Sequence, residues 1–246
     1  FFRAPPPYGG PQESFVMQRN RRPMIAGEDC LRLNVWSPTR AGKRPVMVWM
    51  HGGGLFAGSG HELPAYDGRS LADRGDVVVV THNHRLNALG FLDLSSFGGR
   101  WAKSANVGMQ DCVAVLEWVR DNIERFGGDP SNVTIFGQSG GGVKVSTLMA
   151  MPTARGLFHR AIVQSGSPDI MPPRSPAQAA EVAGKILGLL GLDARSLDEL
   201  ATVEPEAVAA AVVKLGLPWR VTVDGTIVPE TPGAATASAQ AGQVPL

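Results

Sequence analysis

The chain has 246 residues, 43% of them hydrophobic, which suits one large α/β domain or two small ones with a packed core. Its 23 Lys and Arg residues face 22 Asp and Glu residues, so the near-zero net charge argues against nucleic acid and charged membrane surfaces as partners. No apolar run approaches the ~20 residues of a membrane span, and we expect a soluble protein.

The N-terminal residues 1–29 are rich in Pro, Gly and Arg and are expected to be irregular. They contain no initial Met and no signal-peptide core, so the chain reads as the interior of a longer product. Cys30 and Cys112 have no zinc-like spacing, and we expect no metal and no other cofactor. Cys112 fits a buried thiol, which slightly favours a reducing compartment. Bacterial cytoplasm and secretion both stay open, as does the oligomeric state.

Strand and helix patterns alternate in the first half of the chain. Residues 31–36 alternate apolar with polar, as in a half-buried strand near a sheet edge, and 45–50 and 77–80 are apolar runs typical of buried parallel strands. A short helix is expected near 67–74. An apolar stripe at spacings of three and four predicts a longer helix, with Asn106 as N-cap and Gly127 as stop: Met109, Cys112, Leu116, Val119, Ile123 and Phe126.

The second half begins with a turn at Asp129–Ser131, which is expected to lead into a buried strand over 133–137. A helix over 140–150 and another buried strand over 161–163 follow. The alternation predicts a mostly parallel sheet covered by helices, with ligands bound beyond the carboxyl ends of the strands. After Ser167 the amphipathic segments 175–190 and 197–214 predict a helical cap, and the Ala-rich segment 233–243 is expected to be mobile.

A glycine-flanked serine follows the strand over 133–137. Gly137, Ser139 and Gly141 form a Gly-x-Ser-x-Gly motif between a strand and a helix, which is how a hydrolase presents a nucleophile on a sharp, strained turn. A flexible loop is the alternative interpretation of so short a pattern. The position of the motif at a strand end favours Ser139 as a nucleophile.

A second glycine cluster, Gly52–Gly54, follows the strand over 45–50. Glycines allow the main chain to bring its N–H groups close to an acyl oxygen, where they stabilise developing negative charge. We therefore expect the amides of Gly53, Gly54 and Gly140 to form an oxyanion hole. His51, which opens this loop, is interpreted as structural.

Seven collinear blocks, together with the segment 223–225, resemble the type-B carboxylesterase family, the cholinesterase-like branch of the α/β-hydrolases. The resemblance covers most of the chain and is carried by residues 28–35, 51–60, 83–87, 106–108 with 118–123, 126–130, 134–142 and 157–162. It implies an α/β-hydrolase fold and a serine esterase that works through an acyl-enzyme on Ser139. It also implies that Ser165 is a buried serine near the acid of the catalytic triad.

The sequence after Ser139 does not supply the acid and the histidine of a catalytic triad in the required order. In this fold the order is serine, acid, histidine, yet His159 is the only histidine after Ser139, and residues 140–158 hold no Asp or Glu. We interpret His159 as a packing residue and place the acid and histidine beyond Leu246. The resemblance thus predicts a partial α/β-hydrolase domain over 1–246, truncated after the strand that follows the nucleophile helix. Its parts are a core over 30–167, a helical cap over 168–220 and the start of the C-terminal half over 221–246.

Gln138 departs from the cholinesterases, which carry glutamate immediately before the nucleophile. A neutral amide removes one negative charge from the pocket floor, so small neutral carboxylic esters fit better as substrates than cationic ones. His82 and His84 resemble a metal-binding pair by residue type. The block that contains them is structural in the family, so we expect no metal there.

Three interpretations remain open at this point: an esterase, a non-catalytic cholinesterase-like binding or adhesion domain, and a fragment that needs an acid and a histidine from another chain. Retention of Ser139 and the oxyanion glycines favours the esterase. The isolated 246-residue chain is expected to be inactive or nearly so.

Overall fold

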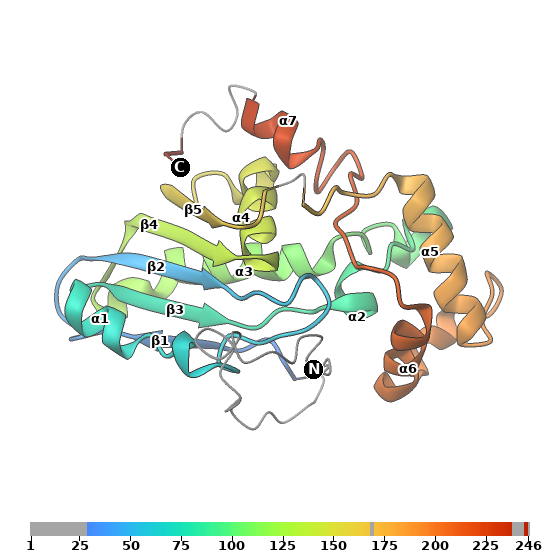
Figure 1. The fold of residues 1–246 in the computed structure, drawn as a ribbon, viewed down its shortest axis with the longest axis horizontal. Helices are drawn as coiled ribbons and strands as arrows, with labels where there is room; N and C mark the ends of the chain where they lie inside the picture. The colour runs from blue at the N-terminus through green and yellow to red at the C-terminus, as the bar shows by residue number, and fades with distance from the viewer. Residues whose placement is uncertain (1–28, 168–169, 238–243, 246) are drawn as a thin grey trace, which may run out of the picture.

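The computed structural model describes residues 29–167, 170–237 and 244–245. Its centre is a five-stranded sheet in the order β1-β3-β2-β4-β5, in which only β1 runs antiparallel to its neighbour (Figure 1). The strands are β1 (Leu33–Trp36), β2 (Arg44–Met50), β3 (Val78–His82), β4 (Gly128–Gln138) and β5 (Arg160–Gln164). The predicted mostly parallel sheet, with an edge strand near residue 33, is confirmed.

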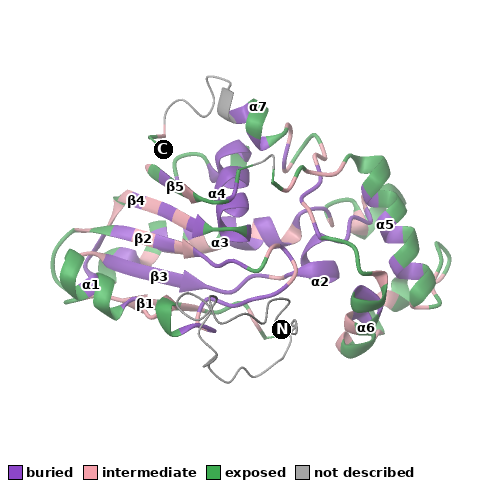
Figure 2. Cartoon of the chain, in the orientation of Figure 1, coloured by how far each residue is buried: buried purple, intermediate pink, exposed green. Residues whose placement is uncertain are grey.

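One face of the sheet is covered by α3 (Val107–Asn122) and α4 (Gly140–Ala150), which pack against each other and against β4. The predicted stripe of α3 supplies this layer: Met109, Cys112, Leu116 and Val119 are all fully buried. They form one buried cluster with the alternating valines of β2 and β3. Figure 2 shows β3 and α4 coloured as buried in this part of the molecule. On the opposite face, α1 (Arg69–Gly75) packs against β3.

The opposite face of β2, β4 and β5 is only partly covered by the described residues. Trp49 and Phe136 pair across β2 and β4 with ring centroids 4.9 Å apart, and Ile162 of β5, which pairs with Phe136, is 43% exposed. The prediction that residues 161–163 form a buried strand is therefore wrong for this face. β5 lies at the sheet edge, where apolar side chains have neighbours on one side only.

The cap region consists of α5 (Pro176–Leu189) and α6 (Pro205–Leu215), which pack together, with α6 also touching α2 (Asn87–Phe91). Ser175 begins α5 with a capping box to Gln178. The amphipathic segment 197–214 is divided into a 3-10 helix over Leu197–Thr202 and α6, because Pro205 cannot continue a helix and starts a new one.

Three further predictions need correction. The turn at Asp129–Ser131 lies inside β4, as an irregularity in its pairing with β2. Asn106 is the N-cap residue of α3, as predicted, but its side chain makes no capping hydrogen bond. Its backbone is left-handed, and its side chain bonds Thr222 and Asp224 instead. Residues 233–237 of the segment expected to be mobile belong to helix α7 (Pro232–Ala237), and residues 238–243 lie outside the described part, as do 1–28.

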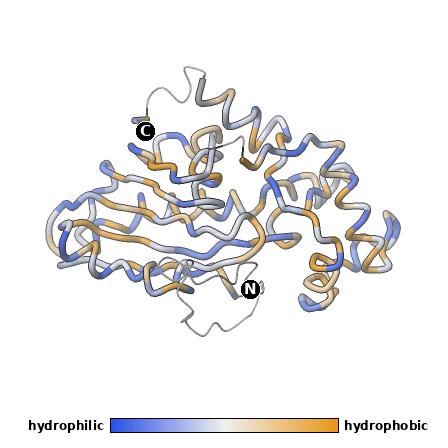
Figure 3. Tube along the Cα trace, in the orientation of Figure 1, coloured by the Kyte–Doolittle hydropathy of each residue, from blue (hydrophilic) through white to orange (hydrophobic). Residues whose placement is uncertain are grey.

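Hydrophobic residues concentrate along the central strands and the inward faces of the helices (Figure 3). Among the described residues, no helix combines the length and the apolar character that crossing a membrane requires.

Candidate active site

Ser139 sits on a sharp turn between β4 and α4. Its backbone has φ 57° and ψ −122°, a conformation that is costly for a residue with a Cβ and is kept where the surroundings enforce it. The Ser139 amide donates to the carbonyl of Gln164 at 2.8 Å, and its own carbonyl accepts from Val143 at 3.1 Å. The side chain is exposed at the carboxyl end of the sheet. This is the geometry of a nucleophile elbow.

The glycine loop after β2 lies directly against this elbow. A Cβ placed on Gly140 would be 2.4 Å from the Cα of Gly54, and one placed on Gly52 would be 4.0 Å from the Cβ of Ser139. The two main chains therefore approach so closely that a side chain at position 140 would overlap the loop. The structure brings together the residues that the sequence predicts as nucleophile and oxyanion donors.

The amides of the loop are available to a ligand. Gly53 and Gly54 have φ angles of 91° and 64°, which glycine adopts freely. Within the described residues, neither donates its amide hydrogen to a protein acceptor. Gly140 is the first residue of α4, where amide hydrogens have no partner inside the helix and the helix dipole favours negative charge. Gly54 and Gly140 thus lie against each other beside Ser139, and Gly53 directly precedes Gly54 in the loop.

The first turn of α4 is seated on the end of β2. A Cβ on Gly141 would be 2.0 Å from the carbonyl oxygen of Met50, and a Cβ on Gly137 would be 2.5 Å from the carbonyl carbon of Gly141. No side chain fits at either position without moving the backbone. The glycines of the motif therefore serve contact between elements as well as the turn itself.

The two neighbouring polar residues are both exposed. Gln138 ends β4 beside Gln164 of β5, with its side chain open to solvent. Ser165 has φ 49° but is exposed, so the expectation of a buried serine is wrong for the described residues. The reason is that Ser165 follows β5, the edge strand, which only part of the described chain covers.

His159 lies at the opposite end of the sheet from Ser139. Its Nδ1 accepts a hydrogen bond from the amide of Val133 at 3.0 Å. Ser139 lies six residues beyond Val133 along β4, so at about 3.3 Å per residue the elbow is roughly 20 Å from His159. His159 therefore cannot accept a proton from Ser139, and its predicted packing role agrees with these contacts.

A cluster of buried basic side chains behind the glycine loop went unrecognised as a unit in the sequence. The rings of His51 and His84 stack with centroids 4.7 Å apart, His82 lies beside them, and the ammonium of Lys144 donates to the His51 carbonyl at 2.8 Å. All four side chains are buried. The signal available was Lys144 itself, a lysine in an otherwise small and apolar helix.

The histidines of this cluster are neutral near pH 7. The Nδ1 atoms of His51 and His84 donate to the carbonyls of Gly52 and Arg85, and each Nε2 is buried with no hydrogen-bond partner among the described residues. Burial holds the pKa of both rings well below 6.5, and the charge of Lys144 lowers these pKa values further. Burial also lowers the pKa of His82 to about 4.

We expect the protein to lose stability as the pH falls from about 6.5 toward 5, because the unfolded chain binds protons on these three histidines and the folded chain does not. Each histidine steepens the loss by about 1 kcal/mol per pH unit. Urea unfolding followed across this pH range measures the slope. In a His82→Asn variant, the slope of the unfolding free energy against pH is expected to be smaller by the contribution of one histidine. A free energy of unfolding that stays constant across the range would contradict the account.

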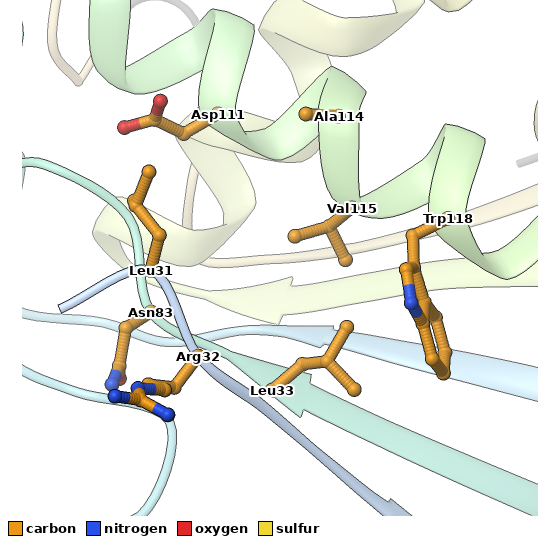
Figure 4. Close-up of a pocket in the computed structure, with 8 residues that line it drawn as sticks. All are labelled: Leu31, Arg32, Leu33, Asn83, Asp111, Ala114, Val115 and Trp118. Carbon is orange, nitrogen blue, oxygen red and sulfur yellow. The ribbon is translucent and has the colours of Figure 1, made fainter. Parts of the chain in front are cut away.

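A separate cavity of about 190 Å³ opens between β1 and α3 (Figure 4). Asp111 at its rim binds the guanidinium and the amide of Arg85, which fixes the segment after β3 onto α3. The cavity contains none of the predicted site residues; its lining is Leu31, Arg32, Leu33, Asn83, Asp111, Ala114, Val115 and Trp118. It is therefore distinct from the site around Ser139.

A parallel sheet with a serine elbow and a glycine loop at its carboxyl end defines an α/β-hydrolase. Residues 6–246 match the Carboxylesterase family, and the chain belongs to that family. It is 44% identical to para-nitrobenzyl esterase of Bacillus subtilis (strain 168) over 229 residues, and 42% identical to carboxylesterase 3 of Homo sapiens over 224 residues.

The solved structures show the same relationship. A PNB esterase superposes with a TM-score of 0.82 at 43% identity, covering 87% of this chain and 47% of that one. An esterase from Clostridium hathewayi, described as hydrolysing aliphatic aromatic polyesters, gives 0.81 at 46% identity, with coverage of 92% and 47%. Of the curated relatives, this chain covers 46% of the B. subtilis protein and 38% of the human one, and 89% of it is matched in each case. The chain thus spans half or less of the length of these relatives.

Proposed function

We propose that the protein is a carboxylic ester hydrolase that works through an acyl-enzyme on Ser139. The observation that carries this proposal is the contact between the two glycine segments, in which the backbone of Gly54 lies against Gly140 beside an exposed serine. An ester carbonyl carbon placed at the Ser139 hydroxyl would have its oxygen next to the amides of Gly53, Gly54 and Gly140. Family membership supports the same chemistry.

The reaction would proceed in two halves. The hydroxyl of Ser139 attacks the ester carbonyl while a histidine takes its proton, and the three amides stabilise the oxyanion of the tetrahedral intermediate. Collapse of the intermediate releases the alcohol, to which the histidine returns the proton. Water, activated by the same histidine, then hydrolyses the acyl-enzyme and frees Ser139.

The base and its acid partner must come from outside residues 29–167, 170–237 and 244–245. None of the five histidines completes a triad in this fold's order of serine, acid and histidine. His51, His61, His82 and His84 precede Ser139, and His159 lies at the far end of β4 with no Asp or Glu between it and Ser139. We propose that the full-length protein supplies a carboxylate and a histidine, in that order, after residue 246. The expectation that the isolated chain is inactive follows from the same point.

We further propose small neutral esters as the substrate class. Gln138 is exposed next to the nucleophile and carries no charge, so this part of the pocket floor offers a cation no electrostatic attraction.

The test compares two thioesters of equal shape, acetylthiocholine and its neutral 3,3-dimethylbutyl counterpart, with the full-length protein. The neutral ester is expected to have the higher kcat/KM, and Gln138→Glu is expected to shift the ratio toward the cationic one. A wild-type preference for the choline ester would contradict the substrate proposal. Absence of turnover with both esters and with p-nitrophenyl acetate would favour a binding domain.

A further inference from the structure

Lys144 connects the nucleophile helix to the glycine loop. It lies on α4 five residues after Ser139, its side chain is fully buried, and its Nζ donates to the carbonyl oxygen of His51 at 2.8 Å. His51 is the residue from which the loop with Gly53 and Gly54 departs. The same carbonyl oxygen lies 3.1 Å from the position that a Cβ on Gly141 would occupy. Lys144 thus holds a carbonyl that also lies close to the backbone of Gly141 on the same helix.

A lysine at this position costs stability that an apolar residue would not. Burying an ammonium is unfavourable unless hydrogen bonds and opposite charge compensate for lost water. The hydrogen bond to His51 supplies part of this compensation, and the carboxylate of Glu62 favours the charged form. Burial lowers the pKa of Lys144 to about 8, so it carries its charge near pH 7.

The histidines and the thiol around Lys144 are neutral at this pH. Burial lowers the pKa values of His51, His82 and His84, and it raises the pKa of the Cys112 thiol to about 12. The ammonium is therefore the positive charge of this pocket, with Glu62 and, further away, Asp111 as the acids that act on the cluster. The Lys144 ammonium donates its hydrogen bond to the carbonyl oxygen of His51, the residue at which the glycine loop begins.

We propose that Lys144 is a positioning residue, which holds the glycine loop in register with the nucleophile elbow through the His51 carbonyl. The proposal rests on the proposed function, because the register matters for catalysis only if Gly53 and Gly54 bind an oxyanion. Displacing such donors by about 1 Å lowers a rate by on the order of 100-fold. Ground-state binding depends less on this register, so kcat falls and KM does not.

The test uses the full-length protein with Lys144→Met, which keeps most of the side-chain length and removes the donor. Thr147→Val is the matched control, because Thr147 is also buried on α4 but bonds only within its own helix, to the carbonyl of Val143. For Lys144→Met we expect kcat to fall by about 10 to 100-fold with KM within about 3-fold. For Thr147→Val both constants should stay within about 3-fold of wild type.

Hydrogen exchange of residues 51–58 gives a readout that does not need activity. The amides of Phe56 and Ala57 donate to the carbonyl of Gly53 inside the loop, and their exchange is expected to quicken at least about 10-fold in Lys144→Met and not in Thr147→Val. Should Lys144→Met fail to fold, Lys144→Gln carries the test. It keeps a donor on a shorter side chain, and is expected to lower kcat with KM unchanged.

The outcomes separate the two proposals. Unchanged kcat and unchanged loop exchange in Lys144→Met would overturn the positioning role, and so would equal losses in Lys144→Met and Thr147→Val. If wild type shows no Ser139-dependent hydrolysis, the proposed function fails, and loop exchange alone decides whether Lys144 holds the loop.

Discussion

Ser139→Ala is expected to lower ester hydrolysis by the full-length protein by on the order of 10⁴ to 10⁶-fold, because removing the nucleophile closes the acyl-enzyme route while substrate binding and the oxyanion amides persist. KM is expected to change little. The measurement is turnover of p-nitrophenyl acetate, together with labelling by a fluorophosphonate that forms a bond to the active serine. Label is expected on wild type and absent from Ser139→Ala.

The 246-residue chain alone provides the contrasting arm of this prediction. Because no acid and histidine follow Ser139 in the order this fold uses, the chain is expected to hydrolyse p-nitrophenyl acetate no faster than its own Ser139→Ala variant. Serine-dependent turnover well above that variant would refute the argument for a missing base. Full labelling of Ser139→Ala in the full-length protein would place the nucleophile elsewhere.

Gly141→Ala is expected to lower the free energy of unfolding by about 3 kcal/mol or more, and to reduce activity by at least on the order of 100-fold. The added Cβ would lie 2.0 Å from the carbonyl oxygen of Met50, so either β2 or the first turn of α4 must move. Both elements carry the site, because one leads into the glycine loop and the other follows Ser139. Urea unfolding and the kcat for ester hydrolysis measure the two effects.

Gly184→Ala provides the matched control for a glycine-to-alanine change in a helix. Gly184 lies in α5, and a Cβ there meets nothing within 4 Å. Alanine at this position is expected to raise stability by about 0.5–1 kcal/mol and leave activity unchanged. If Gly141→Ala were as stable and as active as wild type, the close seating of α4 on β2 would be wrong.

The parts of the fold that were predictable from sequence are those in which local pattern and tertiary burial agree. The stripe of α3 and the apolar runs of β2 and β3 belong to elements buried on the faces that the pattern indicates. The glycine motifs were equally informative about where the site lies. Gly140 and Gly141 are required by backbone contact with the glycine loop and with β2, and Gly53 by backbone contact with Ala57 inside the loop, so no other residue type fits at these positions.

The predictions that failed depend on contacts across long sequence distances. Asn106 looks like a helix cap, but its side chain is used by Thr222 and Asp224, more than a hundred residues away. Ser165 was expected to be buried, yet it follows an edge strand that the described chain covers on one side only. Lys144 gave no motif, because its importance lies in one hydrogen bond to a backbone carbonyl 93 residues earlier.

The most direct test of the oxyanion arrangement is a crystal structure of the full-length protein after reaction with a fluorophosphonate. We expect the phosphorus on the Ser139 hydroxyl oxygen, with one phosphonyl oxygen about 3 Å from the amide nitrogens of Gly53, Gly54 and Gly140. An adduct on Ser139 whose oxygen points away from these amides, or an adduct on another residue, would contradict the account.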